Sequence, residues 1–206
     1  MRIETNEIKI YKFEELSNET KETVFDNFRN QINYSFDFKP IVEGIVEDLE
    51  LKGFCNPSIR YDLSCCQGSG ASFICEYIDY EKLAHFLLSE DILDKSQCRT
   101  LNYFTNEGNL SLEVTLGKYS NYHKHQNTVN FDVESNHTGI WANTESDNLT
   151  NLVDILEDNL KQVKDDLCSD ILKTLHNTET YLRSEEYIIE QINSNEYEFT
   201  ADGQIY

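Results

Sequence analysis

The 206-residue chain is poor in basic side chains, with 17 Lys and Arg against 38 Asp and Glu and a net charge of −21. A surface this acidic repels phosphate groups, which argues against direct binding of nucleic acid or of an anionic membrane surface. No window approaches the 18 consecutive apolar residues that a membrane-spanning helix needs. The first residues lack the basic stretch and apolar run of a signal peptide, so we expect a cytoplasmic protein.

The chain also lacks cysteine pairs at the spacing of a metal site. Its six cysteines are irregularly spaced, and no C-x-x-C pair occurs. This favours reduced thiols, partly buried as small apolar side chains, over a disulfide framework or a zinc site. The turn Gly68-Ser69-Gly70 lacks the spacing of a dinucleotide-binding loop and the Lys-Ser/Thr of a P-loop. The sequence therefore predicts no cofactor, no metal and no catalytic residue.

Apolar residues make up 39% of the chain and include 23 Phe and Tyr, which is enough for a hydrophobic core. Alternation, helical spacing and turn residues predict the following elements. Strands are expected at 8–12, 59–63, 71–78, 110–116, 129–133 and within 197–206, and helices at 17–32, 40–53, 81–88, 92–104, 152–175 and after Ser184.

These elements predict one α+β domain over residues 1–206. It consists of a small antiparallel sheet of hairpins with helices packed on it, and of a long acidic amphipathic helix near the C-terminus. Residues 1–135 form the helix-and-hairpin body, and residues 136–206 form an acidic helical region with a terminal strand. The apolar stripe of the long helix runs through Leu152, Leu156, Leu160, Val163, Leu167, Ile171 and Leu175.

The excess of negative charge is concentrated in the C-terminal part of the chain. Residues 131–206 hold 4 Lys or Arg and 17 Asp or Glu, whereas residues 1–130 hold 13 and 21. A small domain needs a net charge of only about 2–8 for solubility. We therefore predict that acidic helix faces contact a basic partner, through Glu43, Glu47, Asp48, Glu50, Asp154, Glu157, Asp158, Asp165 and Asp166.

A second candidate region is the polar loop between the strands expected at 110–116 and 129–133. Tyr122, His123 and His125 are its candidate contact residues. On an extended segment the two histidines face the same side, which suits a metal ion or an acid–base pair. A third ligand would come from Asp132 or Glu134. The alternative is a polar contact surface with aromatic anchors.

Three segments resemble a group of uncharacterised phage and prophage proteins. They are the helix entry EELS-x-E-x-K at residues 14–21, the hairpin CQGSGASF at 66–73, and the terminus DG-x-I-Y at 202–206. The chain departs from that group at Cys65 and Cys66, where aromatic or polar residues are more usual. The resemblance implies a phage setting inside a host cell and transfers no functional residue.

Three hypotheses of function follow. The first is a non-enzymatic inhibitor, of the anti-CRISPR kind, that occupies the basic nucleic-acid-binding surface of a host protein such as a CRISPR effector or a restriction-type nuclease. The second is a small metal- or ligand-binding enzyme that uses His123 and His125 together with Gln67. The third is a phage accessory protein that binds another phage protein. The sequence gives no oligomeric state.

Overall fold

The computed structural model describes residues 8–64, 68–106, 112–135 and 143–206. Its contacts group into two compact units. Unit 1 consists of residues 1–39 and 176–206, and unit 2 consists of residues 40–175. The prediction of one domain over the whole chain stays a prediction.

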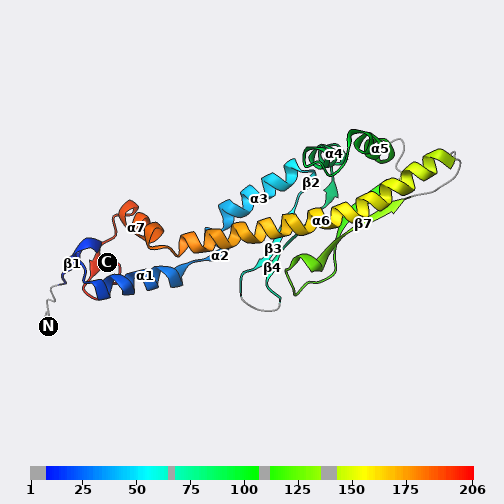
Figure 1. Ribbon diagram of the computed structural model, residues 1–206. Helices are drawn as coiled ribbons and strands as arrows, with labels where there is room; N and C mark the ends of the chain where they lie inside the picture. The colour runs from blue at the N-terminus through cyan, green and yellow to red at the C-terminus, as the bar shows by residue number, and fades with distance from the viewer. Residues whose placement is uncertain (1–7, 65–67, 107–111, 136–142) are drawn as a thin grey trace, which may run out of the picture. The chain divides into compact units, whose positions relative to one another are not determined.

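The architecture is α+β, as predicted: helices accompany small antiparallel sheets of two strands each, and a long helix occupies the C-terminal part (Figure 1). The helices are α1 (Asn18–Gln31), α2 (Tyr34–Asp37), α3 (Lys39–Leu51), α4 (Tyr80–Ser89), α5 (Lys95–Thr105), α6 (Asn143–Leu182) and α7 (Glu185–Ser194), with 3-10 turns η1 (Phe13–Glu15) and η2 (Gln126–Thr128). The strands are β1 (Ile10–Tyr11), β2 (Phe54–Cys55), β3 (Ser58–Asp62), β4 (Gly70–Ile74), β5 (Tyr77–Ile78), β6 (Leu112–Lys118), β7 (Val129–Ser135) and β8 (Phe199–Thr200).

Side-chain caps fix where several helices begin, among them α1, α5 and α7. Ser17 accepts a hydrogen bond from the backbone N–H of Thr20, and Ser184 accepts one from Tyr187. Asp94 accepts bonds from the N–H groups of Ser96 and Gln97. Such caps satisfy backbone donors that the first helical turn leaves without partners. The caps at Ser17 and Ser184 confirm the predicted starts, whereas Asp94 places the start of α5 at Lys95 and not at 92.

Unit 1 has its own aromatic core. Strands β1 and β8 pair antiparallel, with Tyr11 opposite Phe199. The ring of Phe13 packs edge-on against Phe25 and lies 6.2 Å from the ring of Phe199. Helix α7 contributes Ile188 and Ile192 to the same buried cluster. The terminal strand predicted within 197–206 therefore pairs with the opening strand of the chain.

Unit 2 contains three of the two-stranded pairs. The β6–β7 hairpin runs from Leu112 opposite Ser135 to Lys118 opposite Val129, and its buried side chains alternate as predicted. The β3–β4 pair places Arg60 opposite Ser72. The strand predicted over 71–78 is interrupted, since β4 ends at Ile74 and β5 pairs with β2 instead. The turn residues Cys65, Cys66 and Gln67 lie outside the described residues.

Helix α6 is longer than the predicted 152–175, and its apolar stripe faces the interior of unit 2. Leu152, Leu156 and Leu160 are buried. Lys164 is buried on the same helix, and its ammonium group donates to the carbonyl oxygen of Val129 at 3.2 Å. The opposite face of the helix therefore remains available for its acidic residues. Among the described residues, no helix is long and apolar enough to cross a membrane.

Candidate functional site

The nine predicted acidic residues lie on α3 and α6, both within unit 2 over these positions. Seven of them are exposed, while Glu50 and Asp165 are half-buried. Intrahelical contacts hold several in place. Asp48 pairs with Lys52, Asp166 accepts a hydrogen bond from Gln162, and Asp165 lies 3.0 Å from the buried ammonium of Lys164.

A first acidic groove lies between α6 and the end of α4. It encloses about 230 Å³, and its charged lining is Lys52, Glu90, Asp166 and Asp170 above the apolar Val163 and Leu167. Because Lys52 pairs with Asp48, this groove connects a predicted residue of α3 with one of α6. Glu90 and Asp170 were not among the predicted site residues. The position of Asp170 four residues after Asp166 would have indicated that both lie on one helix face.

A second acidic groove lies between α6 and β7 and encloses about 430 Å³. Asp132, Glu134 and Glu157 line it together with Lys161. Glu134 also lies directly opposite Glu113 in the β6–β7 ladder. Like charges in that position are unfavourable, so the arrangement costs the fold some stability. Glu157, a predicted contact residue, therefore shares this groove with Asp132 and Glu134, which were predicted only as possible metal ligands.

The structure does not gather all nine predicted residues into one pocket. At 1.5 Å of rise per residue, Asp154 and Asp166 are about 18 Å apart along α6. Glu43, Glu47 and Glu50 line neither acidic groove. The site in unit 2 is therefore an extended acidic surface along α6, with one acidic groove on each side of the helix. We call it the α6 surface.

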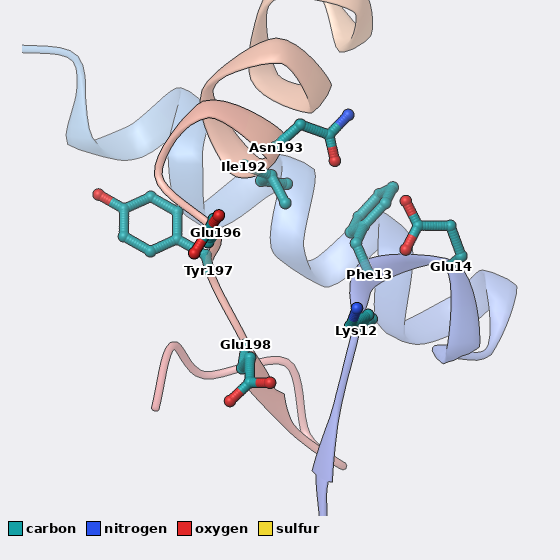
Figure 2. Close-up of a pocket in the computed structure, with 8 residues that line it drawn as sticks. All are labelled: Lys12, Phe13, Glu14, Ile192, Asn193, Glu196, Tyr197 and Glu198. Atoms are coloured by element: carbon teal, nitrogen blue, oxygen red, sulfur yellow. The ribbon is translucent and has the colours of Figure 1, made fainter.

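Unit 1 carries a cavity of about 600 Å³, shown in Figure 2. Lys12, Phe13 and Glu14 line it from the segment around η1. Ile192, Asn193, Glu196, Tyr197 and Glu198 line it from the end of α7 and the residues that follow. Three carboxylates thus surround an apolar floor with a single ammonium group. This cavity was not predicted from the sequence, because its two walls are nearly 180 residues apart in the chain.

The His-containing loop is packed against the β3–β4 hairpin. Arg60 donates through Nη2 to the carbonyl oxygens of Ser120 at 2.6 Å and of His123 at 3.0 Å. The fit is close: a Cβ added at Gly68 would lie 2.6 Å from Nδ1 of His123, and one at Gly70 would lie 2.7 Å from Cα of His125.

The two histidines lie on the same side of the loop, as predicted, with ring centroids 5.8 Å apart and the rings stacked. Tyr122 is exposed over 91% of its surface. The suggested third ligands are engaged elsewhere, since Asp132 accepts a hydrogen bond from Tyr119 and Glu134 lines the groove with α6. Within the described ranges, no three His, Cys, Asp or Glu side chains are grouped to hold a metal ion.

Comparison with known protein families matches most of the chain to a family model. The model of a family described as Domain of unknown function (DUF8835) covers residues 15–185, which include α3, the His-containing loop and the acidic part of α6. Neither the curated proteins nor the solved structures gave a match.

Proposed function

The chain belongs to the DUF8835 family, and we propose that it is a non-enzymatic binding protein whose α6 surface occupies a basic, nucleic-acid-binding surface of another protein. The resemblance to phage proteins favours a host defence protein as this partner, such as a CRISPR effector or a restriction-type nuclease. The observation that carries the proposal is the number of carboxylates along α6, most of which are exposed.

Measured along the helix axis, the density of these carboxylates approaches that of nucleic-acid phosphates. Asp154, Glu157, Asp158, Asp165, Asp166 and Asp170 occupy a stretch of α6 that is about 24 Å long at 1.5 Å per residue. Neighbouring carboxylates are thus about 5 Å apart on average along the helix axis, against about 3.4 Å per phosphate along one strand of DNA. Lys and Arg side chains arranged to bind phosphates would therefore meet carboxylates at a similar density.

The acidic grooves add charge at both flanks of the helix. Glu90 lies on one side, and Asp132 and Glu134 lie on the other. Such a field attracts a basic partner over a distance of about 8–10 Å at physiological salt and accelerates association. It also makes binding sensitive to salt, because the exposed charges are screened. Salt sensitivity is therefore the property to measure.

The test is capture of partners from a lysate of host cells on the immobilised protein, at 0.1 M and at 0.5 M NaCl. The first variant combines Asp154→Asn, Glu157→Gln and Asp158→Asn. A matched control, Glu22→Gln with Glu76→Gln and Glu81→Gln, removes the same charge at exposed positions that line neither acidic groove. A captured partner is then purified and assayed for nucleic-acid binding with and without the protein.

We expect a partner that is retained at 0.1 M salt and by the control variant, but lost at 0.5 M salt and by the α6 variant. The protein should also displace nucleic acid from this partner. The proposal would be refuted if the partner is retained regardless of salt and of the amide substitutions on α6. It would also be refuted if the partner still binds its nucleic acid normally in the presence of the protein.

A further inference from the structure

Unit 2 contains a groove whose charged lining residues, among those the structure describes, are all basic, in a chain with a net charge of −21. It lies between α4 and α5 and encloses about 190 Å³. His85 comes from α4, while Lys95 and Arg99 come from α5. No Asp or Glu lines it. This inference concerns a different surface from the α6 surface and does not depend on the proposed function.

Helical spacing explains why these residues share one groove. Lys95, Cys98, Arg99 and Asn102 stand at positions i, i+3, i+4 and i+7 of α5, so they lie on one face of the helix. On α4, Ala84 and Leu88 are one turn apart. The thiol of buried Cys98 donates to the carbonyl oxygen of Ala84 at 3.4 Å, which closes the floor between the two helices.

Two cations, the ammonium of Lys95 and the guanidinium of Arg99, line this groove. Both side chains are exposed. Among the described residues, neither Lys95 nor Arg99 forms an ion pair or a side-chain hydrogen bond. Two like charges four residues apart on a helix repel each other. The adjacent Asp94 uses its carboxylate to cap the backbone of α5. An anion in the groove would contact both cations and remove this repulsion.

We infer that the α4–α5 groove binds a small organic anion, with its carboxylate or phosphate on Lys95 and Arg99 and a short apolar part on Ala84, Leu88 and Cys98. The guanidinium of Arg99 can hold either anionic group through two parallel hydrogen bonds. The volume corresponds to about six water molecules at about 30 Å³ each, so the ligand is small. A polyanion such as nucleic acid is excluded by the charge of the rest of the chain.

The test is a titration of the ¹⁵N-labelled full chain, followed by NMR, with four probes: butyl phosphate, butyrate, inorganic phosphate and 1-butanol. We expect saturable shifts in the amides of Ala84, Leu88, Cys98, Arg99 and Asn102 with at least one of the two organic anions. The tighter of the two identifies the anionic group. Inorganic phosphate and butanol should bind at least tenfold more weakly than that anion.

Three variants test whether the anion binds in the α4–α5 groove. Arg99→Gln and Lys95→Gln should each weaken binding about tenfold, as expected for loss of a charge-assisted hydrogen bond. Lys173→Gln removes the same charge from an exposed position of α6 outside the groove and should leave the affinity unchanged.

The inference is overturned if neither organic anion gives saturable shifts in these amides, or if butanol or inorganic phosphate binds as tightly. It is equally overturned if Lys173→Gln weakens binding as much as the two groove variants do. Each of these results is independent of whether a partner binds the α6 surface.

Discussion

The ammonium group of Lys164 donates a hydrogen bond to the carbonyl oxygen of Val129 at 3.2 Å, so a buried charge joins α6 to the first residue of β7. Only 3% of Lys164 is exposed. The carboxylate of Asp165 lies 3.0 Å from the same ammonium and is partly exposed. The charge is therefore paired at the edge of the core of unit 2, where its removal leaves polar groups without a partner.

Lys164→Met keeps the apolar stem of the side chain but removes the donor. We expect a loss of about 1–3 kcal/mol in the free energy of unfolding, because a buried acceptor and a nearby carboxylate lose their partner. Lys173→Met, at an exposed position of the same helix outside both acidic grooves, should change it by less than about 0.5 kcal/mol. Urea unfolding followed by circular dichroism measures both. Equal stability of the two variants would contradict a stabilising role for Lys164.

Two glycines of unit 2 should respond in opposite ways to alanine. Gly70 has φ +146°, and a Cβ there would lie 2.7 Å from Cα and Cβ of His125, so Gly70→Ala should cost more than about 2 kcal/mol. Gly44 lies inside α3 with nothing within 4 Å of its added Cβ. Gly44→Ala should therefore stabilise the protein by about 0.5–1 kcal/mol. The midpoints of urea unfolding give the comparison, and a harmless Gly70→Ala would mean that the loop can move away from β4.

Local features of the sequence were sufficient for most helices and for the β6–β7 hairpin. Caps at Ser17 and Ser184 and the alternation around Val114 depend on neighbours within a few residues. The pairing of β1 with β8 and of β2 with β5 depends on chain segments that are distant in sequence. No local pattern specifies such pairs, and the interruption of the strand predicted over 71–78 has the same origin.

The candidate site was predictable to a similar extent. Helical periodicity places Asp154 and Asp158 on the exposed side of α6, because the apolar stripe occupies the opposite face of the helix. The contribution of Glu90 to the groove beside Asp166 requires knowledge of how α4 packs on α6. The basic groove shows the same limit: the spacing of Lys95 and Arg99 is visible in the sequence, but their position facing α4 is not.

Ser72 is completely buried, and its hydroxyl oxygen has no hydrogen-bond partner in the described part of the chain. Since an unsatisfied buried hydroxyl costs stability, Ser72→Ala should be neutral or stabilising by up to about 1 kcal/mol. Thr128 provides the matched control, because its buried hydroxyl donates to the carbonyl oxygen of His125 at 2.8 Å. Thr128→Val should cost about 1 kcal/mol. A clear loss of stability in Ser72→Ala, measured by the same unfolding curves, would indicate that a bound water satisfies the hydroxyl.

The thiols of Cys75 and Cys168 should differ in reactivity although their ionisation is similar. Burial raises the pKa of each thiol to about 11. Cys75 is half-buried, whereas only 1% of Cys168 is exposed. The neutral thiol is favoured in the folded protein, so its stabilising contribution is complete below the unfolded pKa of about 8.5. That contribution is lost as the pH rises from there through about 11.

Alkylation with iodoacetamide between pH 7 and pH 10.5, with peptide mass spectrometry, separates ionisation from access. Because the thiolate is the nucleophile, Cys75 should react slowly at pH 8 and about tenfold faster for each pH unit. Cys168 should follow the same trend at a much lower rate, since its reaction also requires opening of the core. In urea both should react alike, which is the control. If Cys75 reacts in the native protein at pH 8 as fast as in urea, its surroundings do not raise its pKa.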